Sequence, residues 1–407
     1  MMNTFGCSFS DILHKQPLNA KQKRSPHQLV FIIFRIGYIR FMHIVQLLPE
    51  LNQGGIERGT VELNRELVKR GHQSTVISAG GRLSSVIQDD GGNHITLDLC
   101  SKNPFTFFQR SYLLEQELKR INPTLLHARS RVPAWLCWQA NKSLKIPFIT
   151  TVHGFNSVNA YSAIMTKGDY IIYGGNAIKE HILKNYPVNP GDLYYVPRGI
   201  DTDFFDPEKL DRNWIEKFKN NYQLHERTII STVGRITPWK GHDDFIRAIA
   251  EAQKENSSIL GLIVGGVWHD KEDYLEELKG LTTTCKAEII FAGSQSQVRE
   301  IYALSDILVS AASSKPETFG RVAAEAMAMN TPVIASAHGG SLDIISDKAN
   351  GYLFTPHQST ELTEAIHQCL QKPPSQMRTH ICTHFSLSNM VSRELEVYHK
   401  AAAVYGK

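Results

Sequence analysis

From Met42 onward, short apolar runs alternate along the chain with longer amphipathic segments. Short apolar runs are typical of buried strands, and an apolar residue at every third or fourth position is typical of a helix that covers a sheet. The pattern of the first half predicts strands at 43–48, 73–78, 125–127 and 147–152, and helices at 57–70, 111–120, 133–143 and 176–185. This alternation indicates a parallel sheet covered by helices.

Turn-forming residues at Tyr195–Asp203 end this first series and predict a linker. After a charged helical stretch, a second series begins, with strands expected at 228–233, 260–264, 288–291, 307–310 and 332–336. The 407 residues are enough for two separate cores, since a single core stops growing at about 250 to 300 residues. We therefore predict an α/β fold of two doubly wound, Rossmann-like domains that face each other across a cleft.

The pattern divides the chain into four expected parts. They are an N-terminal extension with disorder at 1–41, a first domain at 42–205, a second domain at 206–385, and a C-terminal helix at 386–407 that packs back on the first domain.

The composition, 42% hydrophobic and 21% charged, is that of an ordinary soluble globular protein. The net charge of +4 comes from the first forty residues, where six Lys or Arg face the single Asp11, leaving 38 basic against 39 acidic residues elsewhere. The folded body therefore gives no indication of a nucleic-acid partner. The six cysteines have neither zinc-site spacing nor disulfide-scaffold density, so we expect reduced, mostly buried thiols in a cytoplasmic protein.

The apolar segment Leu29–Phe34 has basic flanks, which is typical of a helix lying on a membrane surface. It is too short to span a bilayer of about 30 Å, and no small-residue cleavage site of a signal peptide follows it. Alternatively, the residues before Met42 are a plain extension or a misassigned start. We expect peripheral contact with the cytoplasmic face of the inner membrane, and Trp135 and Trp138 also motivate this expectation. The alternative is that both tryptophans are core or acceptor-cleft residues.

The strongest chemical signal is a pair of glutamates, Glu317 and Glu325, at a loop-to-helix junction. We expect Thr318 to cap the helix, so that Glu317 precedes the first turn and Glu325 lies in the second. Eight helical residues rise roughly 12 Å, which is too far for a shared proton or metal. The pair suits the hydroxyl groups at two ends of a nucleotide-sugar, and the helix N-terminus between them favours a phosphate.

A second signal is the loop that follows the first strand of the second domain, where Arg235 and Lys240 are five residues apart. An arginine fork and a mobile lysine charge together suit a diphosphate, and they could neutralise a leaving group without a metal. The alternative is a solvated basic loop.

Three weaker signals lie in the first domain and the linker. Gly54 and Gly55 follow the first strand and would let backbone N–H groups approach a phosphate, although a tight turn explains them equally well. His153 follows a strand and faces the expected cleft, although a lone histidine is more often structural. The acidic run Asp201–Asp203 resembles a metal-binding DxD motif, but no strand positions it and we interpret it as a turn.

Together these motifs resemble the large fourth family of retaining glycosyltransferases, which have the two-domain GT-B fold. The resemblance covers nearly everything from Met42 onward. Its matching segments are Gly54-Gly55 with Glu57, 234–241, Glu317 with Glu325, Gly293, 331–335, Gly339-Gly340 and 351–356. Segments 128–135 and 167–169 look most like bacterial enzymes that build lipopolysaccharide or related surface glycans, whereas Gly174-Gly175-Asn176 and Asp343 depart from the usual pattern.

The resemblance implies a role for each motif residue. Arg235 and Lys240 would bind the donor diphosphate, Glu325 the ribose hydroxyls, and Glu317 the transferred sugar. His153 would contact that sugar or the incoming acceptor hydroxyl.

Backbone contacts are implied as well. The N–H groups of Phe319 and Gly320 would hold the sugar or the distal phosphate, and Gly54 and Gly55 would approach the diphosphate from the other domain. Ser294 lies in the segment that would read the base.

The implied activity is retaining, metal-independent transfer of a hexose-type sugar from a UDP- or GDP-sugar to a glycolipid or polysaccharide acceptor, without a further cofactor. Two alternatives remain open: a nucleotide-sugar epimerase with the same fold, and a sugar-nucleotide-binding protein without catalysis.

Overall fold

The computed structural model describes residues 41–407 except 53, 268–271, 347 and 405–407. Residues Met42–Lys407 form one compact unit. Within the described residues this unit contains two parallel sheets, one of seven strands and one of six. The predicted membrane-surface helix at Leu29–Phe34 and Cys7 lie outside the described residues.

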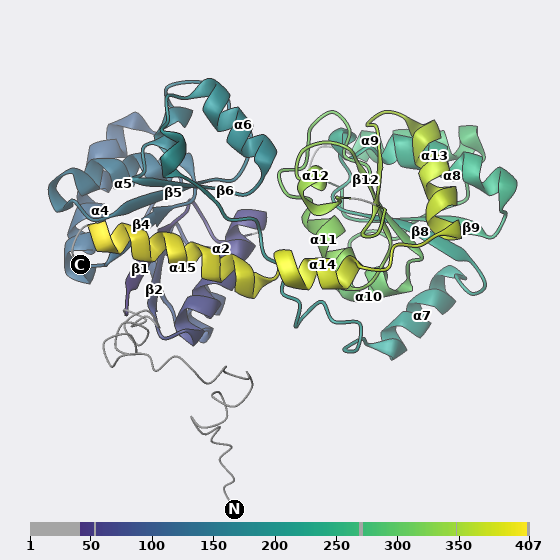
Figure 1. The fold of residues 1–407 in the computed structure, drawn as a ribbon, viewed down its shortest axis with the longest axis horizontal. Coiled ribbons are helices and arrows are strands. Elements are labelled where there is room, and N and C mark those ends of the chain that lie inside the picture. Colours follow the sequence, from purple (N-terminus) through teal and green to yellow (C-terminus); the bar gives the residue numbers. More distant parts are fainter. Residues whose placement is uncertain (1–40, 53, 268–271, 347, 405–407) are drawn as a thin grey trace, which may run out of the picture. The chain divides into compact units, whose positions relative to one another are not determined.

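The first lobe has strands and helices in alternation (Figure 1). In chain order they are β1 (His43–Leu47), α2 (Gly55–Lys69), β2 (Gln73–Ser78), α3 (Ser84–Asp89), β3 (Asn93–Thr96), α4 (Phe107–Ile121), β4 (Leu125–Ala128), α5 (Arg131–Leu144), β5 (Phe148–Val152), β6 (Tyr170–Tyr173), α6 (Asn176–Asn185) and β7 (Leu193–Tyr195).

The first sheet has the order β3-β2-β1-β4-β5-β6-β7, with every pairing parallel. Successive strand residues point to opposite faces, so Val45 packs with α4, α5 and α6, whereas its neighbour Ile44 packs with α2 and the C-terminal helix α15 (Leu387–Val404). Helices on both faces explain why the strands are apolar throughout.

The second lobe repeats this construction. Its elements are α7 (Arg212–Tyr222), β8 (Thr228–Val233), α8 (His242–Glu255), β9 (Ile259–Val264), α9 (Glu272–Cys285), β10 (Ile289–Phe291), α10 (Val298–Leu304), β11 (Ile307–Ser310), α11 (Arg321–Ala328), β12 (Val333–Ser336), α12 (Ser341–Ile344), β13 (Tyr352–Phe354), α13 (Ser359–Gln371) and α14 (Met377–His384).

The second sheet has the order β10-β9-β8-β11-β12-β13. Ile230 on one face packs with α8, α9 and α13, and Leu308 on the other packs with α11 and α14. In both sheets the strand order reverses beside the first strand, between β1 and β4 and between β8 and β11. Ligands of open α/β sheets bind at the carboxyl ends of the strands at such a reversal.

The chain crosses between the lobes twice, and the two crossings pair with each other. The backbone N–H of Ile200 donates to the carbonyl of Phe385 (2.8 Å), and that of Leu387 donates to the carbonyl of Ile200 (2.8 Å). Gly199 is required here, since a Cβ atom on it would lie 2.6 Å from the Cα of Leu387.

Several expectations need correction. Strands β3, β6, β7 and β13 were not predicted. Ile95 is the one apolar residue of β3, whereas β6, β7 and β13 are apolar runs about as short as the predicted β10 and were missed. The cysteines are free in the described residues, but only Cys137 and Cys369 are buried; Cys100 is exposed, and Cys285 and Cys382 are partly exposed.

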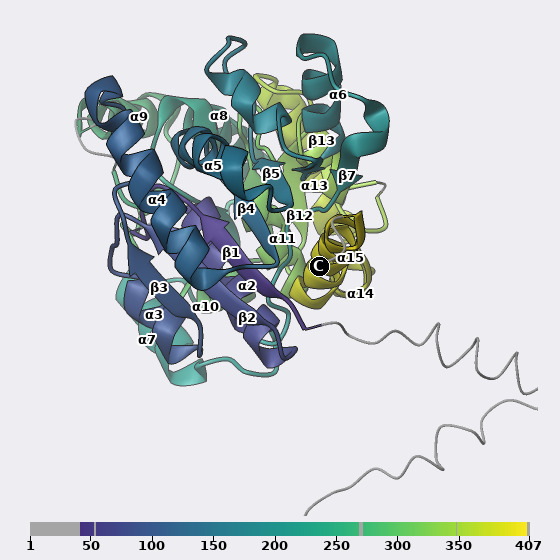
Figure 2. The same ribbon diagram turned by 90° about the vertical axis from the view of Figure 1, so that its left-hand side faces the viewer.

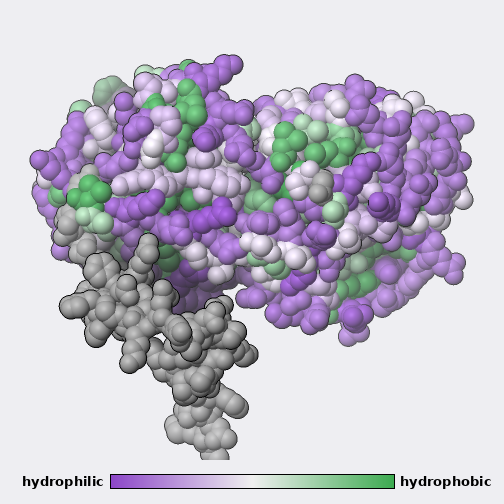
Figure 3. All heavy atoms as spheres, in the orientation of Figure 1, coloured by the Kyte–Doolittle hydropathy of each residue, from purple (hydrophilic) through white to green (hydrophobic). Residues whose placement is uncertain are grey.

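Two views describe the rest of the surface. Figure 2 shows α4 and α5 on the first lobe, where the two helices contact each other. On the face drawn in Figure 3, hydrophilic residues predominate and hydrophobic ones form small separate groups. No helix in the described part of the chain is long and apolar enough to cross a bilayer.

Candidate active site

The reversal point of the second sheet brings together one residue from each of the two strongest predicted signals. Lys240 follows β8 and Glu317 follows β11, and the Lys240 ammonium forms a short ion pair with the Glu317 carboxylate. Both side chains are about one-fifth exposed, so a ligand can reach them. The Lys240 ammonium also lies 4.4 Å from the ring centroid of Trp239. This pair places one positive and one negative group where a donor would bind.

The loop around Glu317 is held by close backbone packing against Gly339 and Gly340. The Gly340 N–H donates to the Glu317 carbonyl (2.8 Å), and a Cβ atom on Gly339 would lie 2.3 Å from that same oxygen. A Cβ atom on Gly340 would lie 2.4 Å from the Cα of Phe319. The glycine pair in the sequence is therefore a steric requirement of the Glu317 loop.

The predicted cap of the following helix is wrong. Helix α11 begins at Arg321, and its N-cap is Gly320, with φ of 84° and no side-chain cap, instead of Thr318. Glycine adopts this left-handed conformation without strain, which explains why it, and not a threonine, ends the loop. Glu325 still lies in the second turn of the helix, as predicted.

Glu325 is 4% exposed and both of its oxygens are already engaged. The Tyr302 hydroxyl donates to Oε2 (2.9 Å) and the Arg321 guanidinium donates to Oε1 (2.7 Å). Burial and the Glu325 charge raise the pKa of Tyr302 well above its usual value, so that it remains a donor. A carboxylate oxygen accepts more than one hydrogen bond, so Glu325 keeps capacity for a ribose hydroxyl.

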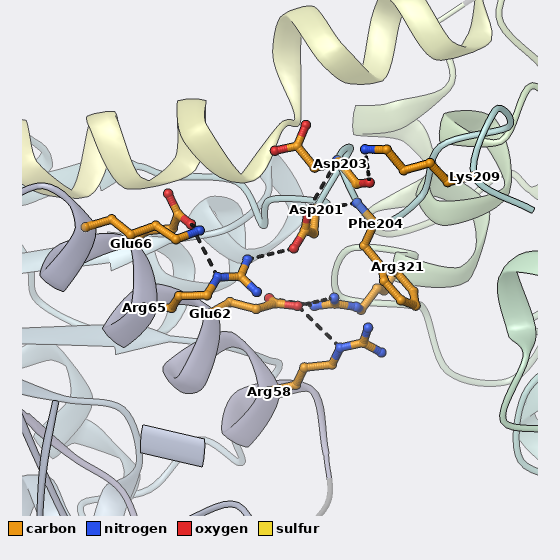
Figure 4. Close-up of polar contacts among 10 residues, drawn as sticks. Arg58, Glu62, Arg65, Glu66, Asp201, Asp203, Phe204, Lys209 and Arg321 are labelled. Carbon is orange, nitrogen blue, oxygen red and sulfur yellow. Dashed lines mark hydrogen bonds and ion pairs between the residues drawn. The ribbon is translucent and has the colours of Figure 1, made fainter. Parts of the chain in front are cut away.

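Arg321 was missed by the sequence reasoning. Its guanidinium donates to both oxygens of Glu62 on α2 (2.6 and 3.2 Å), and thereby links Glu325 to the first lobe. Figure 4 shows Glu62 between Arg321 and Arg58, whose Nε lies 3.3 Å from the same carboxylate. In the sequence, the alternating Arg and Glu at 58, 62 and 65 look like an ordinary charged helix face, so nothing there predicts these contacts with Arg321.

Gly54 and Gly55 open α2 on the wall of a pocket of about 480 Å³ that Glu325 and Arg321 also line. No atom lies within 4 Å of a Cβ atom built on Gly55, whereas one on Gly54 would lie 2.3 Å from the Glu57 carboxylate. The structure thus brings the predicted glycines and the predicted ribose anchor to one pocket.

His153 follows β5 and is close to the Glu317 loop, since a Cβ atom on the adjacent Gly154 would lie 3.5 Å from Cγ2 of Thr318. His153 and Phe319 line the same small cavity of about 20 Å³, room for roughly one water. Nδ1 of His153 accepts from the Arg198 guanidinium (3.2 Å), which puts the ring proton on Nε2. Nε2 is buried and has no partner among the described residues.

Burial, followed by the charges of Arg198 and Arg129, lowers the pKa of His153 well below its ordinary value of 6.5. The imidazole is therefore neutral at pH 7, with a fixed N–H donor at Nε2. Such a donor suits a sugar hydroxyl.

Arg235 and Ser294 are exposed residues on loops that follow β8 and β10, at the carboxyl edge of the second sheet. Neither lines the two pockets described above. They share the sheet edge with Lys240 and Glu317.

The two departures from the family pattern contact each other. The backbone N–H and the side-chain amide of Asn176 donate to the Asp343 carboxylate (3.0 and 2.6 Å). A Cβ atom on Gly175 would lie 2.6 Å from the same carboxylate, so glycine is needed beside it. Burial raises the pKa of Asp343.

The acidic run at Asp201–Asp203 lies in a turn, as interpreted from the sequence. Asp201 accepts from the backbone N–H groups of Asp203 and Phe204 and from Arg65 (2.6 Å) (Figure 4). Within the described ranges, no group of three or more His, Cys, Asp or Glu side chains is placed to hold a metal ion.

Comparison with known proteins relates both lobes to one enzyme class. Residues 53–204 match the model described as Glycosyltransferase Family 4, and residues 214–381 match Glycosyl transferases group 1. The crystal structure of a glycosyltransferase from Rickettsia africae ESF-5 is 30% identical, with a TM-score of 0.81, and covers 89% of this chain and 99% of that one.

Two further relatives are less similar in sequence. The Anabaena protein Alr3699/HepE, solved in complex with UDP, is 19% identical with a TM-score of 0.77 over 88% of this chain and all of its own length. The D-inositol 3-phosphate glycosyltransferase of Salinispora arenicola is 26% identical over 317 residues, 69% of this chain and 70% of its own. The predicted fold class and family are confirmed: the chain belongs to the group 1 and Family 4 glycosyltransferases and has the GT-B fold of two doubly wound α/β domains.

Proposed function

We propose that this glycosyltransferase moves a hexose-type sugar from a nucleotide-diphosphate-sugar, UDP- or GDP-linked, to a glycolipid or polysaccharide acceptor. The observation that carries the proposal is the meeting of Lys240 and Glu317 at the reversal point of the second sheet. The domain at 206–385 binds the donor, and the domain at 42–205 supplies His153 and the acceptor side. The UDP bound to the Anabaena relative supports a nucleotide-linked donor.

In the proposed reaction the bond between the anomeric carbon and the diphosphate oxygen breaks, and the acceptor oxygen bonds to that carbon on the same face. The leaving diphosphate takes the acceptor proton, and the configuration is retained because the acceptor attacks the face from which the diphosphate leaves. Arg235 and Lys240 stabilise the negative charge that develops on the diphosphate, together with the N-terminal N–H groups of α11. These groups supply the charge stabilisation that a metal ion provides in other transferases.

Glu317, released from its ion pair with Lys240 when the diphosphate binds Lys240, accepts hydrogen bonds from the transferred sugar. Glu325 holds the ribose hydroxyls, and the Phe319 and Gly320 N–H groups, Gly54, Gly55 and Ser294 complete the donor contacts. The uncharged His153 donates from Nε2 to the sugar or to the acceptor hydroxyl.

The biological setting is part of the proposal: synthesis of lipopolysaccharide or another surface glycan at the cytoplasmic face of the membrane. The solved fold relatives include the lipopolysaccharide outer core galactosyltransferase WaaB, which is 16% identical and shares the fold.

The test is sugar transfer from UDP- and GDP-sugars to acceptor glycolipid, measured for wild type, Lys240→Ala and Glu317→Gln. We expect Lys240→Ala to lower kcat about 100-fold, since it removes a preorganised charge from the leaving group. Lys279→Ala and Glu276→Gln are matched controls, because these residues form an exposed ion pair on α9. Unchanged transfer in both site variants would refute the assigned site, and an inverted product by NMR would refute retention.

The two alternatives make different predictions in the same assay. An epimerase converts the donor when no acceptor is present, whereas a binding protein binds UDP without any product in the presence of acceptor.

A further inference from the structure

A cationic group in the first lobe has no part in donor binding. Arg129 and Arg131 lie where β4 runs into α5, at the reversal point of the first sheet. With His153 and Asn156 they line a pocket of about 230 Å³.

Several hydrogen-bond donors at this pocket are buried and unpartnered. Arg129 is 2% exposed; its Nη1 donates to Gln46 (3.1 Å), but its Nε has no partner among the described residues. The same holds for Nε2 of His153. Nη1 of Arg198, in the wall of the cavity of about 20 Å³ that Arg129 and His153 also line, is likewise without a partner among the described residues. A buried donor without an acceptor costs free energy, so these groups favour a ligand that accepts hydrogen bonds.

The pocket also carries excess positive charge. Glu394 lies 3.9 Å from Nη1 of Arg129, but no carboxylate of the described residues comes within 4.0 Å of the Arg131 guanidinium, which bonds the Ser162 hydroxyl instead (3.2 Å). Burial, then the charges of Arg129 and Arg321, lower the pKa of Arg198 to about 9. An anion would relieve this crowding of like charges.

The first turn of α5 adds further donors. Ser130, the N-cap of this 14-residue helix, and Arg131, its first residue, both line the pocket, and Ser130 makes no side-chain cap. Because Pro133 has no N–H, the donors of this turn are the N–H groups of Arg131 and Val132. A phosphate is a favoured ligand at such a position when cationic side chains flank it.

An apolar pocket of about 560 Å³ adjoins the cationic one. Its walls include Phe107 and Phe108 of α4, Trp135 of α5, and Tyr161. Arg131 lines the cationic pocket and Tyr161 lines the apolar one, and the Arg131 guanidinium lies 5.3 Å from the Tyr161 ring centroid, so these two side chains form a wall that the pockets share. Phe108 is 71% exposed, which is unfavourable in water unless an apolar group covers the ring.

We infer that the acceptor is an anionic amphiphile: a phosphate group bound by Arg129 Nε–H, Arg131 and the start of α5, carried on a hydrocarbon chain in the apolar pocket between α4 and α5. This inference rests on the proposed transfer reaction and names the class of acceptor for it. It also places the acceptor beside the Thr318 loop, where the donor sugar would lie.

The test is calorimetric titration of the full chain, with saturating UDP to occupy the donor site. The probes are decyl phosphate, inorganic phosphate and uncharged decyl maltoside, each below its micelle concentration and at fixed ionic strength. We expect decyl phosphate to bind most tightly. Arg131→Gln weakens it about tenfold, in line with the loss of a charge-assisted hydrogen bond, and Arg131→Lys weakens it less. Phe108→Ser weakens decyl phosphate and leaves inorganic phosphate unchanged.

The matched control is Arg120→Gln, since Arg120 is an exposed arginine on α4 that pairs with Glu117. Equal affinity for decyl maltoside, or wild-type affinity for decyl phosphate in Arg131→Gln, overturns the inference. Wild-type affinity in Phe108→Ser overturns the apolar part of it. The donor site is tested separately, because Lys240→Ala should lose UDP binding and keep decyl phosphate binding. If UDP does not bind the wild type, the proposed donor site is refuted. The decyl phosphate titration, repeated without UDP, then still tests the proposed class of acceptor.

Discussion

Lys240 and Glu317 are 77 residues apart in sequence and form a direct ion pair in the structure. At the scale of single residues, such pairs show that the binding groups hold each other in place before a ligand enters. His153 is held in the same way, since Arg198 donates to its Nδ1 and thereby fixes the donor at Nε2. The fixed His153 donor needs little rearrangement in the proposed reaction, whereas the Lys240–Glu317 ion pair must open when the diphosphate binds.

Arg321 makes the most consequential contact of a single residue, because it bridges Glu62 and Glu325, both nearly buried. We expect Arg321→Met to lower the free energy of unfolding by about 3 kcal/mol, since it leaves buried carboxylates without a cationic partner. It should also raise the KM for the donor, because Glu325 loses its positioning contact.

Urea unfolding of Arg321→Met, Glu62→Gln and the double variant measures the free energy of coupling between the Arg321 and Glu62 side chains. Arg299→Met is a suitable control, because Arg299 pairs with the buried Glu300 away from this pocket. Additive effects of the two substitutions would contradict the predicted coupling.

At the scale of elements, α15 completes the first lobe although it is the last helix of the chain. It packs against α2 and β4, and its buried Tyr398 hydroxyl contacts Nδ1 of His127 (2.7 Å) and the Glu394 carboxylate (2.8 Å). His127 in turn contacts the Thr151 hydroxyl (2.6 Å), and Thr151 lies in β5, two residues before His153. The helix thus supports the strand end that carries the histidine.

Tyr398→Phe should therefore lower the free energy of unfolding by about 1–3 kcal/mol, because it leaves two buried polar partners unsatisfied. Tyr112→Phe is the matched control, since Tyr112 is 60% exposed on α4. Thermal or urea unfolding of the two variants measures this difference in stability. Equal unfolding midpoints would mean that the His127–Tyr398 contact contributes nothing to the free energy of unfolding.

At the scale of the whole molecule, several histidines are buried in neutral form in both lobes. Burial lowers the pKa of His43, His127 and His153, and burial followed by the Lys240 charge lowers that of His242 to about 4. In the unfolded chain each would protonate near pH 6.5. The unfolded state therefore binds more protons than the folded state once the pH falls below that value.

The free energy of unfolding should consequently be greatest above pH 6.5 and fall from there toward pH 5, by up to about 1.4 kcal/mol per pH unit for each such histidine. Urea unfolding at pH 7.5, 6.5 and 5.5 measures this slope. His242→Gln should reduce the slope of the free energy of unfolding with pH, whereas His225→Gln, at an exposed position, should leave that slope unchanged. A constant free energy of unfolding across this range would show that the histidines protonate in the folded state.

Apolar periodicity in the sequence predicts the two doubly wound domains, most strand positions and the helices at 57–70, 111–120, 133–143 and 176–185, because buried parallel strands are apolar runs and covering helices are amphipathic whatever surrounds them. The family was predicted from the resemblance of its motifs. The sequence also identified Lys240, Glu317 and Glu325 as candidates, since each follows or opens an element at a sheet edge. The edge strands β3, β7 and β13 and the neighbouring β6 were not predicted, although the equally short edge strand β10 was, since three or four residues carry too little periodicity to distinguish a strand reliably from a loop.

Only the tertiary structure decided which charges meet. The contacts of Arg321 with Glu62, of Asn176 with Asp343 and of Arg198 with His153 join segments far apart in the chain, and periodicity carries no information about such distances. The left-handed cap at Gly320 is likewise set by the packing of Gly339 and Gly340 against the Glu317 loop, because a local capping preference yields when the surrounding backbone leaves one conformation open.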